Sequence, residues 1–272
     1  MKVLFVPVTY NSYDALESYI ASVGKALEAA ADPTIEVKIH VADNSTSLKA
    51  DAHNCQLSIV NYQLSNYPNP GYLPAALKTV YSEDYASYDY IIISNVDVTL
   101  DETFFTALRD LKADTDTVWI APFIWSPSEQ RDVNPKIQER YTKKRLRLLR
   151  LFFRFPLIWY TYSKSVYRLR KQETTSSLPK GGSIYAGHGS FMIFRPEIFQ
   201  QEPSLDYPVF LFCEEIYMAE MAQHIGKKVT HCPSVKVWDC EHASTGLMGL
   251  WRYCKYNHDA LSYIIRTFYE QD

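Results

Sequence analysis

The chain has 272 residues, of which 47% are hydrophobic and 22% are charged, and its formal net charge is −3. It is long enough for a full core in one large domain or two small ones, and its composition is ordinary for a globular protein. The lack of any run of 18 apolar residues argues against a membrane-spanning helix. The apolar run at the start is too short for a signal peptide, and five cysteines without CxxC spacing fit a reducing compartment, so we expect a cytoplasmic protein.

The small net charge hides one strongly basic segment. Residues 141–171 contain ten Lys or Arg and no acid, which leaves 18 bases against 31 acids in the rest of the chain. We therefore expect this segment to meet something anionic. Nucleic acid is a poor candidate for that partner, because the acidic remainder of the protein would repel phosphate.

Strand-like and helix-like segments alternate through residues 1–125. Apolar or alternating runs predict strands at residues 2–8, 35–45, 57–62 and 88–98, and helical periodicity follows the first and the third of them. This alternation predicts a parallel α/β sheet with right-handed connections. In such sheets ligands bind beyond the carboxyl ends of the strands.

Polar residues stand at the expected carboxyl ends of three of these strands. Asn and Asp favour strand ends for a purely local reason as well, since their side chains bond to nearby backbone. Three coincident polar tips nevertheless favour a shared binding site over three separate turns. The residues at these tips are Thr9, Tyr10 and Asn11, then Asp43 and Asn44, and finally Asn95 and Asp97.

Eight short motifs follow one another along nearly the whole chain, namely VPVTYNS, ADNSTS, NPGYLPAAL, SNVDV, GHGSFMIFRPEIF, EE, HAST and YCKYN. In this order they resemble the inverting nucleotide-sugar glycosyltransferases of family 2, in particular their rhamnosyl- and galactofuranosyltransferase-like branch. The resemblance implies a GT-A fold, which is an α/β fold with a mostly parallel sheet flanked by helices. We then expect a single domain over residues 1–272, with a nucleotide-binding half at 1–125, a basic insertion at 126–180 and an acceptor-binding, catalytic half at 181–272.

The resemblance also implies a divalent metal at the end of the fourth strand. A nucleotide-sugar donor leaves as a diphosphate, and Mg²⁺ or Mn²⁺, which prefer carboxylate oxygens, would neutralise its charge. Asp97 matches the family's metal and diphosphate residue, and Asn95 would support the turn or the ribose. His242 matches the histidine that can complete the metal's ligands. The alternatives are a turn role for Asp97 and an inert His242.

The donor's base is expected to meet Asp43, which matches the family's base-recognition carboxylate. A carboxylate accepts the imide N–H of uracil or thymine, which favours a UDP- or dTDP-linked sugar. The alternative is a capping role toward Ser45 or Thr46. Gly71 resembles the loop that closes over the nucleotide, and small residues around His188 would let sugar and acceptor approach the backbone. The full set of expected donor contacts is Thr9, Tyr10, Asn11, Asp43, Asn44, Gly71, Asn95, Gly187 and His188.

The acid pair Glu214–Glu215 matches the position of the family's catalytic base. Inversion by direct displacement needs one carboxylate to take a proton from the attacking hydroxyl. The second position, Glu215, is expected to be this base, with Glu214 orienting its neighbours. An ordinary acidic helix N-terminus is the alternative. The family often carries a further acid and an Arg along the helix, where this chain has Tyr217 and Met221.

Within the basic segment, Lys143, Arg147, Arg150 and Arg154 recur at helical spacing beside an apolar stripe of Leu146, Leu149 and Phe153. A basic amphipathic helix suits docking on an anionic membrane surface, here the inner face of the membrane. A polyprenyl-diphosphate-linked acceptor would explain such docking. The alternatives are a solvated lid and an oligomer contact such as a homodimer interface.

Two classes of function remain open at this stage. The first is an inverting, metal-dependent glycosyltransferase that moves a sugar onto a glycan or a lipid-linked acceptor in surface polysaccharide synthesis. The second is a catalytically silent sugar-nucleotide-binding or scaffold protein on the same fold, suggested by Tyr217 and Met221. A nucleotidyltransferase is disfavoured, because the chain lacks the Gly-rich, basic phosphate loop expected near its N-terminus.

Overall fold

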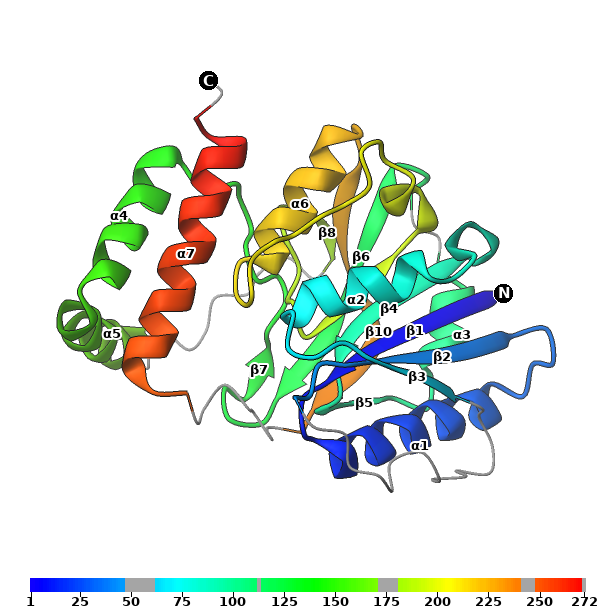
Figure 1. The fold of residues 1–272 in the computed structure, drawn as a ribbon. Coiled ribbons are helices and arrows are strands. Elements are labelled where there is room, and N and C mark those ends of the chain that lie inside the picture. Colours follow the sequence, from blue (N-terminus) through cyan, green and yellow to red (C-terminus); the bar gives the residue numbers. More distant parts are fainter. Residues whose placement is uncertain (47–61, 112–113, 171–180, 241–247, 271–272) are drawn as a thin grey trace.

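The computed structural model describes residues 1–46, 62–111, 114–170, 181–240 and 248–270, with the backbone alone at 164–170. A ten-stranded sheet runs through the molecule in the order β3-β2-β1-β4-β9-β6-β10-β5, with β7 paired to β6 and β8 to β10 (Figure 1). Among the described residues, no helix has both the length and the apolar character that crossing a bilayer requires.

The first four strands form a parallel block, as the alternation of strand-like and helix-like segments predicts. All three pairings within the block are parallel. The third strand begins only at Tyr62, and the rest of the segment predicted for it, 57–61, lies outside the described residues. The bounds of the block are Lys2–Thr9 for β1, Glu36–Asp43 for β2, Tyr62–Asn66 for β3 and Tyr90–Asn95 for β4.

Beyond β4 the sheet is mixed. β9 (Phe191–Phe194) lies antiparallel between β4 and β6 (Thr117–Ser126). β6 in turn pairs in parallel with β10 (Lys228–Asp239). Hydrophobic periodicity predicts that a strand exists, but it does not predict the direction of that strand in the sheet. The direction depends here on the long connections between the strands. The remaining short strands are antiparallel to their partners, namely β5 (Val98–Leu100), β7 (Arg131–Asp132) and β8 (Gly182–Ile184).

The strand predicted at 88–98 is in fact two strands. β4 ends at Asn95, and β5 begins at Val98 and pairs with β10 at the far edge of the sheet. Val96 and Asp97 therefore lie in the turn between them. This break puts Asp97 at a strand end, where the sequence predicts a functional carboxylate.

Both faces of the sheet are buried, which explains why β1 is an almost unbroken apolar run. Alternate residues of β1 enter two different cores. Val3 and Phe5 pack with α1 (Tyr13–Ala30) and α3 (Phe104–Arg109). Leu4 and Val6 pack in the core that contains residues of α2 and α6. The other short helices are α2 (Tyr72–Tyr81), α6 (Glu214–His224), η2 (Tyr85–Ser87) and η3 (Pro196–Phe199).

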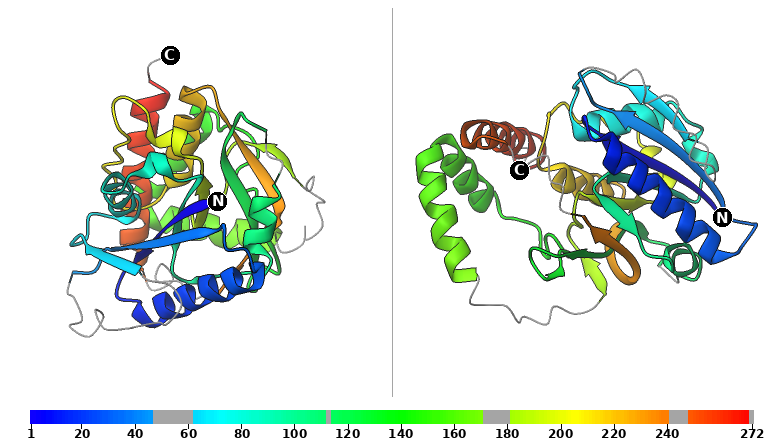
Figure 2. Two further views of the ribbon diagram at one scale, coloured as in Figure 1. Left: turned by 90° about the vertical axis from the view of Figure 1, so that its right-hand side faces the viewer. Right: turned by 90° about the horizontal axis from the view of Figure 1, so that it is seen from below.

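Three helices form a separate layer beside the sheet (Figures 1 and 2). They are α4 (Lys143–Arg154), α5 (Pro156–Arg170) and α7 (Leu250–Phe268). The Thr142 hydroxyl caps α4 by accepting a hydrogen bond from the backbone N–H of Arg145 at 3.3 Å.

The apolar stripe predicted on the basic helix has a different role from the expected one. Leu146 and Phe153 are buried and Leu149 is half-buried, in the core cluster that α4 shares with α7. The stripe is therefore internal packing and is covered by protein. Periodicity shows that a helix has an apolar face, but it does not show what covers that face.

Candidate active site

A cavity of about 600 Å³ opens at the carboxyl ends of β1 and β4, between the sheet and the starts of α6 and α7. One wall, the strand wall, comes from the strand ends. The opposite wall, the helix wall, comes from α6, α7 and the loop before α6. Eight residues predicted from sequence line this cavity: Thr9, Tyr10, Asn44, Asn95, Asp97, His188, Glu214 and Glu215.

Strand register brings the polar tips together. Thr9 is the parallel partner of Asp43, and Val8 is the partner of Asn95. The backbone N–H of Asn44 donates to the Thr9 carbonyl at 2.8 Å, which extends this pairing past the end of β2. The ends of β1, β2 and β4 thus meet at one edge, as a parallel sheet requires.

Thr9 borders the cavity and carries a buried hydroxyl without a hydrogen-bond partner among the described residues. The residue as a whole is fully buried from solvent. A buried hydroxyl without a partner is costly, so native proteins rarely leave one without a reason. A bound ligand would have to displace neighbouring side chains to reach it, because the hydroxyl itself is not exposed in the cavity.

Asp43 is buried behind the cavity and does not line it. Its carboxylate accepts hydrogen bonds from the Tyr13 hydroxyl at 2.9 Å and from the backbone N–H of Ser45 at 3.0 Å. Asn11 is exposed and does not line the cavity either, and its N–H donates to the Ser45 hydroxyl at 2.8 Å. These two predicted donor residues therefore shape the loops that support Thr9 and Asn44.

Gly71 joins the two walls. Its N–H donates to the Asn44 side chain at 3.3 Å, and the next N–H, of Tyr72, donates to the Phe210 carbonyl at 3.1 Å. A Cβ on Gly71 would lie only 2.3 Å from that carbonyl oxygen, and the φ of +114° is unsuited to other residues. Glycine is thus needed for close packing at this joint, while the neighbouring Asn69 and Tyr72 line the cavity.

Asp97 lines the cavity from the turn after β4. Its backbone carbonyl accepts a hydrogen bond from Cys240 at 2.8 Å, so the end of β10 holds the turn in place. The other side of the turn is fixed by the Asn95 N–H, which donates to Ser190 at 2.8 Å. Within the described parts of the chain, no group of three His, Cys, Asp or Glu residues is placed to hold a metal. His242 lies outside the described residues.

His188 faces the cavity as a neutral imidazole. Burial, followed by the charges of Lys136 and Arg131, lowers the pKa of His188 to about 3. Its Nδ1 accepts the Ser190 N–H at 3.2 Å, so the proton of the neutral ring is carried by Nε2. The neighbouring Gly187 does not line the cavity, and a Cβ there would lie 2.8 Å from the Ala121 side chain.

The acid pair begins α6. Phe212 and Cys213, just before it, both have positive φ values of 75° and 61°. Glu214 is 5% exposed and accepts the Phe212 N–H at 2.8 Å. Burial, followed by the charge of Glu215, raises the pKa of Glu214 to about 8. Glu215 is half-buried, and its Oε2 lies 3.7 Å from where a Cβ on Gly189 would be, so glycine leaves room in front of this carboxylate.

Tyr72 is influenced by acids from both walls of the cavity. Its hydroxyl donates to the Gly189 carbonyl at 2.8 Å. Burial, and then the charges of Glu214 and Asp97, raise the pKa of Tyr72 well above its usual value. Asp97 and the acid pair also line the same cavity, so they can act on one bound molecule.

The two departures from the family pattern lie away from the cavity. Tyr217 is 3% exposed, its hydroxyl accepts the Asp206 N–H at 3.0 Å, and its ring packs on Tyr207 with centroids 4.8 Å apart. Met221 is half-buried against the same core cluster. Neither residue lines the cavity, so the cavity wall is unchanged by both.

Sequence reasoning missed two cations of the cavity wall. Lys136 lies in the loop after β7, where no local pattern marks it. Arg252 lies on α7 together with Tyr256, four residues later on the same helical face, and both line the cavity. That i, i+4 pair is the only signal that could have indicated Arg252. Both cations suit an anionic ligand.

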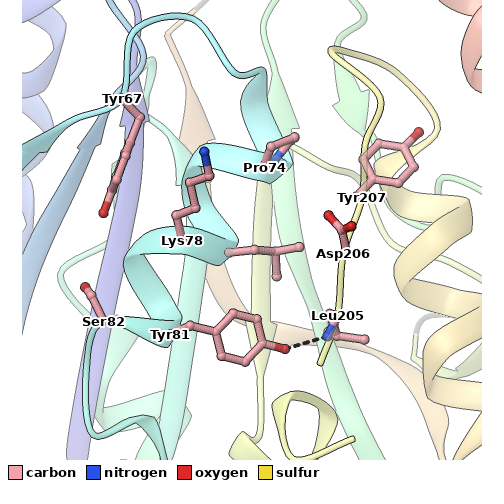
Figure 3. Close-up of a pocket in the computed structure, with 9 residues that line it drawn as sticks. Tyr67, Pro74, Lys78, Tyr81, Ser82, Leu205, Asp206 and Tyr207 are labelled. Carbon is pink, nitrogen blue, oxygen red and sulfur yellow. Dashed lines mark hydrogen bonds between the residues drawn. The ribbon is translucent and has the colours of Figure 1, made fainter. Parts of the chain in front are cut away.

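A second cavity, of about 370 Å³, lies on the outer side of α2 (Figure 3). There the Tyr81 hydroxyl accepts the backbone N–H of Leu205 at 2.8 Å. Its single carboxylate, from Asp206, is exposed, and none of the predicted site residues lines this cavity. It lacks the opposed acids of the first cavity, which remains the candidate active site.

No protein-family model matches the sequence, and no curated protein matches it. Solved structures share the fold. The mannosyltransferase PcManGT from Pyrobaculum calidifontis, in complex with GDP-Man and Mn²⁺, aligns over 97% of this chain and 64% of its own, with a TM-score of 0.56 and 12% identity. GalNAc-T7, with UDP, GalNAc and Mn²⁺, aligns over 88% of this chain and 44% of its own, with a TM-score of 0.54 and 13% identity.

The chain thus spans less than two thirds of each of these two proteins. S. aureus TarS 1-349, in complex with UDP-GlcNAc, aligns over 98% of this chain and 73% of its own, with a TM-score of 0.53 and 9% identity. At such identities the likeness concerns the fold. The predicted GT-A fold of glycosyltransferases is confirmed.

Proposed function

We propose that the chain is an inverting glycosyltransferase that moves a sugar from a nucleoside-diphosphate sugar to an acceptor hydroxyl. The observation that carries this proposal is the opposition, within one cavity, of a strand wall bearing Thr9 and Asp97 to a helix wall bearing Glu214 and Glu215. The cavity lies at the switch from parallel to antiparallel strands, where α/β sheets bind ligands. PcManGT and TarS, which share the fold, bind GDP-Man and UDP-GlcNAc.

In this proposal the strand wall binds the donor. Asn95 and Asn44 contact the nucleoside and the diphosphate beside Thr9, and Lys136 attracts the diphosphate's charge, with Arg252 as a second cation on the helix wall. The resemblance suggests UDP- or dTDP-linked sugars as the donors. Asp43 would act on the base through the loop that carries Asn44, because it pairs with Thr9 in the strand register but does not itself line the cavity.

The residues present fit a hard divalent ion, Mg²⁺ or Mn²⁺. Asp97 offers carboxylate oxygens to the cavity, and a bound diphosphate brings further oxygens, so a full set of protein ligands is not needed. His242, which follows Cys240 by two residues, would be the second protein ligand. The ion would supply charge neutralisation for the leaving diphosphate.

The chemistry is assigned to the helix wall. Glu215 takes the proton from the acceptor hydroxyl, whose oxygen forms a bond to the anomeric carbon from the face opposite the diphosphate. The bond from that carbon to the diphosphate oxygen breaks, and the nucleoside diphosphate leaves with the electron pair. Glu214 holds the Phe212–Cys213 turn, and the His188 Nε2–H donates a hydrogen bond to a sugar hydroxyl.

The wider assignment follows the resemblance. We place the chain with the rhamnosyl- and galactofuranosyltransferase-like branch and propose a glycan or polyprenyl-diphosphate-linked acceptor in surface polysaccharide synthesis. The proposed location is the cytoplasmic side of the membrane. The proposed division is a nucleotide half at 1–125, an insertion at 126–180 and an acceptor half at 181–272. The alternative of a silent scaffold loses support, because Tyr217 and Met221 lie outside the cavity.

A panel of nucleotide sugars tests the proposal. We expect thermal stabilisation by a UDP- or dTDP-sugar in the presence of Mn²⁺, followed by release of the nucleoside diphosphate when an acceptor is added. Stabilisation without any release, across acceptors and metals, would favour the silent scaffold. The absence of stabilisation by every donor would contradict both.

A further inference from the structure

Large apolar side chains are exposed mainly in one part of the molecule. Ten such side chains are exposed among the described residues, and seven of them lie between residues 148 and 162. An eighth, Trp251 at the start of α7, is 68% exposed. Single exposed apolar residues are ordinary, whereas a gathering of this kind marks an interaction surface.

α4 has two apolar faces, and only one of them is covered. Leu146 and Phe153 are buried against α7. On the opposite side, Leu148, Leu151 and Phe155 recur at i, i+3 and i+7, a spacing that collects them on one helical face. Their exposed fractions are 51%, 51% and 46%.

α5 continues this surface. Leu157 and Ile158 in its first turn are 69% and 50% exposed. The next residue, Trp159, points inward, with its ring centroid 4.1 Å from Phe153 and 6.3 Å from Tyr253 of α7. The start of α5 is therefore fixed beside the start of α7. The apolar patch is defined as Leu148, Leu151, Phe155, Leu157, Ile158 and Trp251.

Cations border the apolar patch. Residues 141–163 contain six basic side chains and no acid, and four of the six (Lys143, Arg147, Arg150 and Arg154) form a row along α4 beside the exposed leucines. No ion pair joins these six to an acid in the part of the chain that the structure describes. The surface thus offers apolar and positively charged groups together.

The apolar patch adjoins the cavity through α7. Tyr253 packs on Phe212 with centroids 5.1 Å apart, and Phe212 lines the cavity. Arg252 and Tyr256 of α7 line the cavity as well, while Trp251 faces solvent. A partner on the apolar patch would therefore lie beside the helix wall.

We propose that the apolar patch and its bordering cations dock the protein on an anionic lipid surface. An anionic bilayer interface offers phosphates to the cations and an apolar phase to the inserted side chains, and this combination matches what α4 and α5 present. A two-fold contact between copies of the chain would bring the same cations face to face. Nucleic acid would leave the apolar side chains in water.

Docking also defines the class of acceptor. A docked protein holds its cavity close to the lipid headgroups, because the apolar patch and the helix wall share α7. An acceptor sugar linked to a membrane lipid through a diphosphate can then reach Glu215. This second step rests on the proposed function, whereas docking itself does not.

Vesicle co-sedimentation tests the docking. We expect the wild-type chain to bind vesicles of phosphatidylcholine with phosphatidylglycerol at low salt, to bind pure phosphatidylcholine far less, and to be released as salt rises. Because one basic residue near an anionic surface contributes about fivefold to partition, the triple change Arg147→Glu, Arg150→Glu and Arg154→Glu should weaken partition about a hundredfold.

A second variant removes apolar contacts only. Leu151→Ser, Leu157→Ser and Trp251→Ala together should weaken partition at least about tenfold. All three side chains are exposed, so the fold should survive, as circular dichroism would check. The matched controls are Lys25→Glu with Arg266→Glu, which are exposed cations away from the apolar patch, and Trp238→Ala, an exposed Trp on β10. Both controls should keep wild-type partition.

Four results would overturn the docking. They are failure of the wild type to bind anionic vesicles at low salt, binding that neither patch variant weakens, tighter binding to duplex DNA than to vesicles at equal salt, and a wild-type dimer that the patch variants convert to monomers. Sugar transfer to a soluble acceptor without vesicle binding would refute docking and leave the proposed function standing. Vesicle binding without donor binding would support docking and refute the proposed function.

Discussion

The two walls of the cavity are held in place by different means. On the strand wall, Thr9 and Asn95 owe their positions to the parallel register of β1, β2 and β4. On the helix wall, Glu214 and Glu215 follow Phe212 and Cys213, two consecutive residues with positive φ. Glu214 is a buried carboxyl with a raised pKa. Sheet register suits steady binding of a donor, whereas a buried carboxyl with a raised pKa beside a second acid is typical of a proton-transfer site. The walls therefore differ in task.

The largest expected effect is a loss of kcat without a loss of donor affinity, caused by a substitution on the helix wall. Replacing Glu215 with Gln should lower kcat roughly 10²–10⁴-fold, since the general base is removed. Donor affinity should stay near that of the wild type, because the strand wall is untouched. Glu215→Asp should keep partial transfer, with a carboxylate that reaches less far.

Steady-state kinetics and donor titration on the same preparations check this pair of outcomes. Glu214→Gln is the matched comparison, since it changes the neighbouring acid in the same way. Full transfer by Glu215→Gln together with lost transfer by Glu214→Gln would show that the two acids have been assigned the wrong way round.

The stability of the protein should be sensitive to the size of the side chain at position 71, where the two walls meet. Gly71→Val places a Cβ within 2.3 Å of the Phe210 carbonyl oxygen at a φ of +114°. We expect a loss of about 3 kcal/mol or more in the free energy of unfolding. Gly226→Ala is the control, because its φ of +68° is strained but its surroundings are open, and it should cost about 1 kcal/mol. Equal losses in urea denaturation would mean that contact with Phe210 does not matter.

Stability should depend on pH through the helix wall. The pKa of Glu214 is about 8 in the fold against an ordinary value of 4.5, so the folded chain keeps a proton that the unfolded chain releases. Its stabilising contribution is fully present below about pH 4.5 and is lost as the pH rises toward 8. Glu214→Gln should flatten this part of the stability profile by up to about 5 kcal/mol. Denaturation at several pH values measures it, and parallel profiles for both proteins would contradict the buried, protonated carboxyl.

On the strand wall, one substitution is expected to raise the free energy of unfolding slightly rather than lower it. Thr9→Val keeps the shape of the side chain but removes a hydroxyl that has no partner among the described residues. The free energy of unfolding should rise by about 1 kcal/mol. Thermal melts of the wild type and the variant check this direction. A loss of stability would mean that the Thr9 hydroxyl is already satisfied.

Sequence patterns predict the strand wall better than the helix wall. An apolar run that ends in polar residues identifies both a strand and its tip, which is why Thr9, Asn95 and Asp97 could be expected at one edge. The same patterns say nothing about strand direction, so the antiparallel insertion of β9 was not foreseen. Arg252 and Lys136 reach the cavity only through tertiary packing, and their local sequence looks like solvated surface.

The basic helix shows the same limit. Helical spacing identified α4 and its apolar stripe of Leu146, Leu149 and Phe153, but the structure covers that stripe with α7. The exposed leucines at 148 and 151 carry no sequence signal that separates them from buried ones. Which apolar face is covered depends on a helix a hundred residues further along the chain.

The most direct test of the two-wall account is a calorimetric titration of UDP, dTDP and GDP, with and without Mn²⁺, into three proteins. These are the wild type, Asp97→Asn and Glu215→Gln. We predict Mn²⁺-dependent binding of a pyrimidine diphosphate to the wild type and to Glu215→Gln, and a loss of at least about tenfold in affinity, or about 1.4 kcal/mol, for Asp97→Asn. Unchanged affinity in Asp97→Asn, or lost affinity in Glu215→Gln, would contradict the division of labour between the walls.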